Sequence, residues 1–170
     1  DHLMNTIKGC LEMGFAPDWP LELDVIPVNN VSQFIIHASF NPGSYGKVFN
    51  ILSKNKLSWR TLMMELRSFG YSLQIVSDAE WKSQHLSRIA NKNALFPLSP
   101  LYLENKGLYS GNGKKYSSDF YHTENAQEIY YSSSIRQPSI HRELIQTYLS
   151  YLQYCGFLIY PKSNDKNDAP

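Results

Sequence analysis

The sequence predicts a mixed α/β fold, and three observations support it. Apolar residues recur at helical spacing in several segments, including 3–11 and 59–69. Short β-rich runs at 21–25 and 73–76 lie between such segments. Helix and strand therefore alternate through about Asn91, and this alternation is typical of mixed α/β architecture.

The first helix is predicted by apolar residues that recur one turn apart, namely Leu3, Ile7, Cys10 and Leu11. Gly14 is placed to end this helix in a left-handed cap. The alternation over 21–25 predicts a half-buried strand that ends at Pro27. Asn29 or Asn30 is predicted to cap a second helix, whose apolar stripe is Val31, Phe34, Ile35 and Ala38.

The run 47–52 is short and β-rich, and it predicts a buried strand. Ser58 is predicted to cap a helix that stops at Gly70 and has one apolar face, formed by Trp59, Leu62, Met63, Leu66 and Phe69. After the strand at 73–76, Ser77 and Glu80 form a predicted capping box. The helix that follows is expected to bury Trp81, His85 and Ile89.

The pattern changes after Asn93. Prolines interrupt any long helix, and the Gly-, Tyr-, Ser- and Lys-rich stretch 106–118 predicts a flexible loop or a lid. Helical periodicity returns over 123–131. Pro138 and Ser139 are predicted to open a final helix that ends at Gly156 and contains Ile140, Leu144, Tyr148 and Leu152.

The length of 170 residues suits one domain, or one domain plus a small lobe. We predict a structured part over 1–161, with its loop at 105–118, and a disordered tail over 162–170. The chain begins in helical pattern at Asp1, which we interpret as a cut through a longer protein.

Composition narrows the function classes. Sixteen Lys and Arg balance fifteen Asp and Glu, and no basic stripe follows a phosphate backbone, so we expect no nucleic-acid partner. The sequence has no signal-peptide pattern and no apolar run near 18 residues, which excludes a predicted membrane segment. Cys10 and Cys155 lie far apart in apolar helical pattern, so we predict buried free thiols and a reducing cytoplasm.

The sequence contains little catalytic chemistry. Its five histidines form no metal-ligand spacing with each other or with the cysteines, so no metal is predicted. Tyr102 and Lys106 have the Tyr-x-x-x-Lys spacing of short-chain dehydrogenases, where the lysine lowers the pKa of the tyrosine. That arrangement needs one helix face, but Pro97 and Pro100 precede the pair and Gly107 follows it. We therefore predict no catalytic residue and no cofactor-binding residue.

Five motifs occur in an order that resembles a known family. They are the helix and Gly-x-x-Pro-like run at 4–17, the strand and Pro-containing turn at 23–31, the strand-like run at 46–52, the Trp, Gly-Tyr and Glu-Trp block at 58–81, and the Tyr-Leu-x-Tyr and Gly-Phe ending at 138–158. Together they resemble the C-terminal part of the thioester reductase domains of nonribosomal peptide and polyketide synthetases. These domains are extended short-chain dehydrogenases.

The resemblance implies the last strands and helices of a Rossmann-type domain plus a mostly helical substrate-binding lobe. In such enzymes NADPH reduces an acyl or peptidyl thioester on the phosphopantetheine arm of a carrier protein, and the product is an aldehyde or an alcohol. The expected partners are thus the carrier protein and the N-terminal nucleotide-binding half of the same reductase. NADPH is expected for the full-length domain and not for this fragment.

The resemblance further implies a groove for the acyl chain. We predict that six apolar residues line it, namely Leu3, Met4 and Ile7 on the first helix, Ile26 and Pro27 at the strand end, and Phe120 after the loop. For each of them, a place in the core is the competing interpretation.

Three functions remain open at this point. The leading one is the substrate-binding and carrier-docking portion of a thioester reductase, inactive by itself. The second is a non-enzymatic module that recognises a carrier protein or an acyl chain. The third is the substrate lobe of another extended dehydrogenase, such as one acting on nucleotide sugars, which would need basic or Asn-rich positions for a diphosphate.

Overall fold

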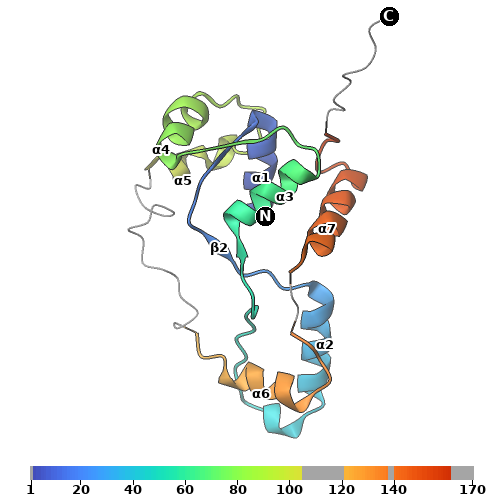
Figure 1. The fold of residues 1–170 in the computed structure, drawn as a ribbon. Coiled ribbons are helices and arrows are strands. Elements are labelled where there is room, and N and C mark those ends of the chain that lie inside the picture. Colours follow the sequence, from blue (N-terminus) through green and yellow to red (C-terminus); the bar gives the residue numbers. More distant parts are fainter. Residues whose placement is uncertain (1, 105–120, 138–139, 162–170) are drawn as a thin grey trace, which may run out of the picture. The chain divides into compact units, whose positions relative to one another are not determined.

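The computed structural model describes residues 2–104, 121–137 and 140–161 (Figure 1). The chain divides into two compact units. The first unit contains residues 1–21, 58–113 and 142–170, and the second contains residues 22–57 and 114–141. Both helices and strands occur, which confirms the predicted mixed α/β class.

The first unit is mainly helical. Its elements are α1 (His2–Met13), β1 (Phe15–Pro17), α3 (Trp59–Ser68), β4 (Gln74–Val76), α4 (Asp78–Glu80), the π-helical turn η2 (Trp81–His85), the 3-10 turns η3 (Leu86–Arg88) and η4 (Phe96–Leu98), α5 (Ser99–Glu104) and α7 (Arg142–Tyr154). The long helix predicted after Ser77 is thus three short pieces of different helical type.

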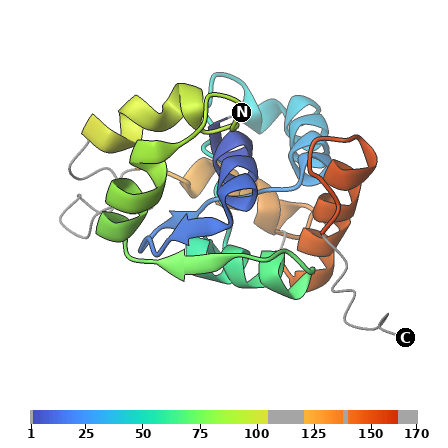
Figure 2. The ribbon, with the colours of Figure 1, turned by 90° about the horizontal axis from the view of Figure 1, so that it is seen from above.

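The strands of the first unit form a parallel pair. β1 lies beside β4 with Ala16 opposite Ile75, and Figure 2 shows the two arrows next to each other. A parallel pair needs a long crossover between its strands. Here α3 is the helix that precedes β4 within the same unit.

An aromatic cluster forms much of the core of this unit. The three tryptophans of the chain, Trp19, Trp59 and Trp81, are all buried, with ring centroids 5.1–5.4 Å from Trp19 to the other two. The indole N–H of Trp59 donates to the carbonyl of Pro17 at 2.8 Å, and that of Trp81 donates to the carbonyl of Phe15 at 3.2 Å. The cluster therefore fixes both ends of β1 while burying large apolar rings.

Several predicted helix ends are confirmed. Ser58 caps α3 by accepting a hydrogen bond from the N–H of Thr61 at 3.0 Å. Ser77 accepts from the N–H of Glu80 at 3.2 Å, as one half of a capping box would. Gly14 follows α1 with φ of +78°, and Gly156 follows α7 with φ of +72°, where a side chain would strain the backbone.

The second unit is built around two helices. Its elements are β2 (Glu22–Leu23), α2 (Val28–Ser39), the 3-10 turn η1 (Pro42–Ser44), β3 (Leu57–Ser58), whose last residue belongs to the first unit, and α6 (Glu124–Ser132). β2 pairs with β3 in a second two-stranded sheet. The core of the unit consists of Phe34 from α2 and of Ala126 and Ile129 from α6.

The buried strand predicted over 47–52 is wrong, because this segment has no regular secondary structure and pairs with no strand. Its backbone is bound instead by side chains near α6. Asn125 donates through Nδ2 to the carbonyl of Val48 at 2.9 Å. The apolar residues of the segment explain the error, since Phe49 and Ile51 pack on the core as strand residues would.

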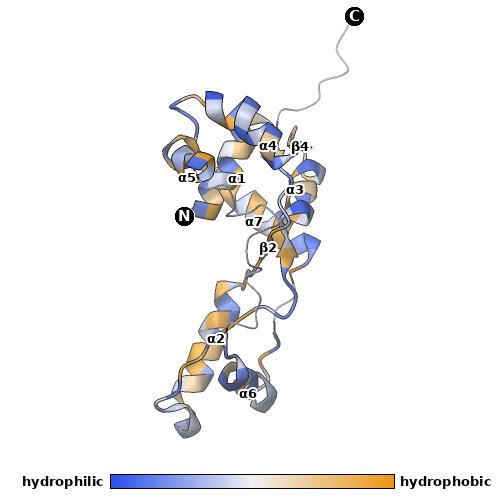
Figure 3. Cartoon of the chain, turned by 90° about the vertical axis from the view of Figure 1, so that its left-hand side faces the viewer, coloured by the Kyte–Doolittle hydropathy of each residue, from blue (hydrophilic) through white to orange (hydrophobic). Residues whose placement is uncertain are grey.

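The predicted cap of α2 is also wrong. The helix begins at Val28 after Pro27, and neither Asn29 nor Asn30 caps it. Asn30 lies inside the helix and is buried. The predicted stripe is partly correct, because Phe34 is buried whereas Ile35 is exposed, and Figure 3 shows hydrophobic residues along the whole of α2.

The two cysteines differ. Cys10 is buried, as predicted, but Cys155 is exposed, because it lies in the turn that follows α7. The predicted start of the last helix at Pro138 and Ser139, the loop at 105–118 and the tail at 162–170 lie outside the described residues. Among the residues that are described, no helix is long and apolar enough to cross a membrane.

Candidate substrate-binding site

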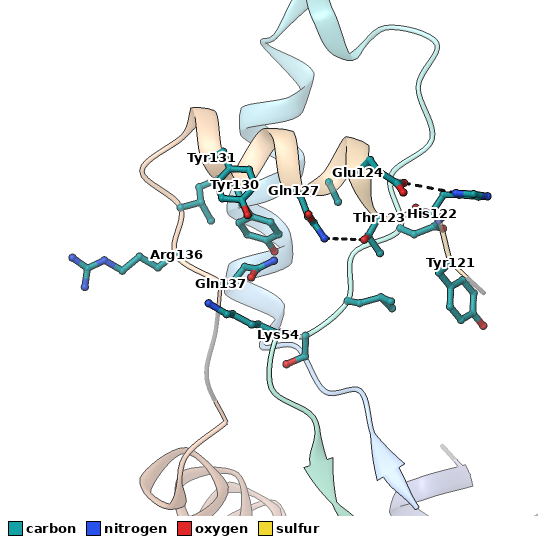
Figure 4. A pocket seen from close by; sticks show the side chains of 15 residues that line it. Lys54, Tyr121, His122, Thr123, Glu124, Gln127, Tyr130, Tyr131, Arg136 and Gln137 are labelled. Atoms are coloured by element: carbon teal, nitrogen blue, oxygen red, sulfur yellow. Dashed lines mark hydrogen bonds and ion pairs between the residues drawn. The ribbon is translucent and has the colours of Figure 1, made fainter. Parts of the chain in front are cut away.

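The second unit contains a cavity of about 850 Å³ (Figure 4). Three segments line it: residues 50–54, residues 121–131 and residues 135–137. Most of the residues that line it have polar side chains, and they include Asn50, Lys54, Gln127, Tyr130 and Gln137. We call this hollow the Tyr130 cavity.

The segment that leads into the cavity is fixed by three polar contacts, two to α6 and one to His122, which precedes that helix. Lys47 pairs with Glu128 at 3.1 Å, and Asn50 donates through Nδ2 to the carbonyl of His122 at 2.9 Å. Asn125 supplies the third contact, to the carbonyl of Val48. These contacts hold residues 47–50 in place without a neighbouring strand, and one of them gives the Val48 carbonyl a side-chain donor.

Asn30 is the polar residue that holds the walls together. Its Oδ1 accepts a hydrogen bond from the hydroxyl of Tyr130 at 2.8 Å, and its Nδ2 donates to the carbonyl of Arg136 at 2.7 Å. Burial raises the pKa of Tyr130, so its hydroxyl stays protonated and keeps its role as donor. The network thus fixes α6 and the 135–137 segment against α2.

The polar side chains of the lining differ in whether they already have partners within the protein. Lys54 has no ion pair among the described residues and extends toward Gln137, while Arg136 extends outward (Figure 4). Gln127 donates to the hydroxyl of Thr123 at 3.0 Å, and Glu124 lies 3.8 Å from Nδ1 of His122. Amide, hydroxyl and cationic groups in this arrangement can bind a polar extended chain by hydrogen bonds.

The described residues contain no group of three or more His, Cys, Asp and Glu that could hold a metal ion. The Tyr102 of the dehydrogenase-like spacing is buried in the first unit. Its hydroxyl lies 2.8 Å from Oγ1 of Thr6 and 2.9 Å from Nε2 of His2, while Lys106 lies outside the described residues. These contacts tie α5 to α1, so Tyr102 has a structural role.

The predicted groove residues are distributed over both units. Leu3 and Met4 are half-buried on α1, and Ile7 on the same helix is buried. Ile26 is half-buried in the second unit beside the buried Pro27, and Phe120 lies outside the described residues. None of the five described residues lines the Tyr130 cavity, so their role as groove residues stays a prediction.

No sequence signal pointed to the residues that do line the cavity. Sequence reasoning favoured apolar residues, whereas the lining residues are mostly of polar type and come from three separate segments. Several of them lie near predicted element ends, such as Leu52 and Lys54 around the end of the expected strand and Thr123 at the start of a predicted helix. Their convergence depends on the Asn30 network, which no local pattern predicts.

No protein-family profile matches the sequence. Among curated proteins, the chain is 27% identical to the L-2-aminoadipate reductase large subunit of Eremothecium gossypii over 98% of this chain and 12% of that protein. It is 30% identical to the aldehyde reductase lnaA of Aspergillus flavus, over 90% of this chain and 16% of that protein. It is 25% identical to a linear gramicidin synthase polypeptide of Brevibacillus parabrevis over 93% of this chain and 3% of that protein. The chain therefore spans a small part of the relatives that it matches.

Two solved structures share the fold. The terminal R domain from the myxalamid PKS-NRPS biosynthetic pathway superposes with a TM-score of 0.78 and 28% identity, over 95% of this chain and 40% of that chain. The thiolation-reductase di-domain from an archaeal non-ribosomal peptide synthetase superposes with a TM-score of 0.69 and 16% identity, over 91% of this chain and 31% of that chain. The second likeness concerns the fold alone.

Proposed function

Because this chain resembles the C-terminal part of a thioester reductase domain, we propose that it is the substrate-binding and carrier-docking portion of such an enzyme. It would hold an acyl or peptidyl chain that is tethered to a carrier protein through phosphopantetheine. The nucleotide-binding half of the reductase would bind NADPH and reduce the thioester to an aldehyde or an alcohol. By itself this chain would bind and not reduce.

One observation carries the proposal. The chain superposes over 95% of its length on the terminal R domain, yet it covers only 40% of that domain. Such a match supports a role as one part of a reductase, with the dinucleotide site in the remaining part. The absence of any predicted dinucleotide motif in the sequence is consistent with this division.

The chemistry of the Tyr130 cavity supports the binding role. A phosphopantetheine arm offers two amides and a phosphate, and the cavity offers Asn50, Gln127 and Gln137 for the amides. Lys54 would supply positive charge toward the phosphate. Because the Asn30 network already fixes the walls, few side chains would lose conformational freedom on binding.

Six apolar residues remain part of the proposal as predicted contacts of the acyl chain. They are Leu3, Met4, Ile7, Ile26, Pro27 and Phe120. Leu3, Met4 and Ile26 are half-buried and have exposed surface for such a contact. Ile7 and Pro27 are buried, so they would support the contacting residues by packing. Free thiols at Cys10 and Cys155 support a reducing cytoplasm as the compartment.

The test uses the isotope-labelled chain and a carrier protein of the same assembly-line type. The carrier is titrated once with an acylated phosphopantetheine arm and once with its serine unmodified. We expect saturable NMR shifts at amides around Asn50, Gln127 and Tyr130 with the loaded carrier only. Equal shifts with the unmodified carrier, or no shifts at all, would contradict the proposal.

A matched pair of variants locates the interaction. Lys54→Gln removes a cation from the lining and should weaken the loaded carrier roughly 5-fold or more, as expected for loss of a charge-assisted hydrogen bond of about 1–2 kcal/mol. Lys56→Gln removes the same charge two residues away, outside the lining, and should leave affinity unchanged. Equal losses of affinity in the two variants would show that the carrier does not bind at the Tyr130 cavity.

Two further titrations separate the competing functions. NADPH should not bind the chain, and tight binding of NADPH would contradict its assignment to the half without the dinucleotide site. A nucleotide sugar such as UDP-glucose probes the third function, because Lys54 and Asn50 are of the types that a diphosphate needs. Shifts with UDP-glucose, and none with the loaded carrier, would favour a nucleotide-sugar dehydrogenase lobe instead.

A further inference from the structure

The first unit has a cavity of its own, of about 550 Å³. We call it the His85 cavity. Its apolar lining consists of Met13, Phe15, Ile89, Ala90 and Ile159, and its polar lining consists of Glu12, Gln84, His85, Arg88, Lys92 and Asn93. No residue lines both this cavity and the Tyr130 cavity, so the two are distinct.

The π-helical turn η2 shapes one wall. Its last residue, His85, stacks on Phe15 of β1, with ring centroids 3.7 Å apart and planes 15° from parallel. Turns of π type are rare and occur often at functional sites, because the wider turn displaces side chains from regular helical positions. Here the displacement places an imidazole against the apolar wall.

The imidazole of His85 carries an unusual atom. Its Nε2 is buried and has no hydrogen-bond partner among the described residues. Buried polar atoms in native proteins nearly always have a partner, so an orphan ring nitrogen in a cavity wall calls for a ligand or a water molecule. The stacking on Phe15 restrains the ring, and His85 is one of the residues that line the cavity.

Charge at the His85 cavity is mainly positive. Arg88 and Lys92 are both exposed, and neither forms an ion pair within the described part of the chain. The carboxylate of Glu12 is the acidic group of the lining, and its Oε2 accepts a hydrogen bond from the N–H of Ala94 at 2.8 Å. The lining therefore contains two cations without an ion pair and one carboxylate that already has a backbone donor.

The remaining polar and apolar groups are held in place. Asn93 donates to the carbonyl of Gly9 at 3.1 Å and accepts from the N–H of Leu95 at 2.8 Å, so its amide is occupied. The carbonyl of Ile159 accepts from the hydroxyl of Tyr71 at 2.8 Å. The apolar wall is thus fixed, and the free binding groups are those of Gln84, His85, Arg88 and Lys92.

From these features we propose that the His85 cavity binds a small organic anion, with the apolar body on Phe15, Ile89 and Ile159 and the anionic headgroup toward Arg88 and Lys92. A bare inorganic ion would leave the apolar wall unfilled, and a neutral ring would leave both cations without a partner. His85 hydrogen-bonds the ligand through its orphan nitrogen. This site lies beyond the proposed carrier-binding function and does not depend on it.

Phenyl phosphate is a suitable probe, because it joins an aromatic body to a phosphate. Titrated into the labelled chain at constant ionic strength, it should give saturable NMR shifts at amides of Phe15, His85 and Arg88. Benzoate is the second probe, because it has a carboxylate in place of the phosphate. The probe that binds more tightly shows whether the ligand is a carboxylate or a phosphate. Inorganic phosphate lacks the apolar body and benzyl alcohol lacks the anionic headgroup, so each should bind at least 10-fold more weakly than phenyl phosphate.

Variants test the residues one by one. Arg88→Gln and Lys92→Gln change exposed side chains and should each weaken the tighter probe at least 5-fold. The control is Arg67→Gln, which removes an exposed cation from α3 outside the cavity lining and should have no effect. No saturable shift with phenyl phosphate or benzoate, or equal losses in the control, would overturn the proposal.

His85→Phe tests the orphan nitrogen. The substitution keeps an aromatic ring to stack on Phe15 and removes the polar atom. We expect weaker probe binding together with unchanged or raised thermal stability, because the buried unpaired atom is gone. If the variant is stabilised but binds the probe as tightly as the unchanged chain, His85 does not contact the ligand. The carrier titration reports on the second unit, so failure of either test leaves the other interpretable.

Discussion

The hydroxyl of Tyr130, on α6, donates a hydrogen bond to Oδ1 of Asn30, on α2, with 2.8 Å between the two oxygens. Asn30 is separated from Tyr130 by 100 residues in the sequence. Its Nδ2 reaches a third segment at the carbonyl of Arg136. A single buried amide thus sets the spacing of the walls around the Tyr130 cavity.

Replacing Asn30 by Ala should destabilise the second unit. The change leaves the Tyr130 hydroxyl and the Arg136 carbonyl without their partner, and a buried unpaired group costs about 1–3 kcal/mol. Hydrogen exchange of the α6 amides should report the loss. Asn29→Ala is the control, because Asn29 is exposed on the same helix and should change stability by less than about 0.5 kcal/mol. Equal exchange in both variants would contradict the role of the amide.

Two adjacent methionines of α3 should respond very differently to truncation. Met63 is fully buried, whereas Met64 is 55% exposed. Met63→Ala should lower the free energy of unfolding by about 2–5 kcal/mol, because a cavity remains in the core. Met64→Ala should cost less than about 0.5 kcal/mol. Urea unfolding measures both, and similar midpoints would show that α3 is packed differently.

The two thiols should differ in reactivity. Cys155 is exposed and should react quickly with a thiol reagent in the folded chain. Cys10 is buried, and burial raises the pKa of its thiol above the usual range, so it holds no reactive thiolate. Mass spectrometry after brief alkylation should therefore find one modified cysteine in the native chain and two after denaturation. Rapid native labelling of Cys10 would contradict the packing of α1.

Cys10 should also make stability depend on alkaline pH. The folded state keeps the thiol protonated because burial raises its pKa, whereas the unfolded thiol ionises above about pH 8.5. The unfolded state then binds fewer protons, so stability falls as pH rises, by at most about 1.4 kcal/mol per pH unit. Denaturant unfolding between pH 8 and pH 10 measures the slope. Cys10→Ala should reduce the slope, and an unchanged slope in this variant would contradict the burial of the Cys10 thiol.

The cavity lining was outside the reach of sequence reasoning for a physical reason. Lys54 belongs to a segment that is far in the chain from Gln127 and Gln137, and the lining side chains have no periodic pattern. The predicted groove residues were chosen because they are apolar, and that criterion also selects core residues such as Ile7. The comparisons confirm the resemblance to reductase domains but do not test the individual groove residues.

The sequence by itself determined the features that depend on neighbours in the chain. The cap at Ser58, the left-handed turns at Gly14 and Gly156, and the buried face of α3 follow from local hydrogen bonding and helical period. Only the tertiary structure decided that residues 47–52 are not a strand, because a strand needs a partner with free backbone groups. It likewise decided that Asn30 joins segments instead of capping a helix, since its partners are brought within reach only by packing.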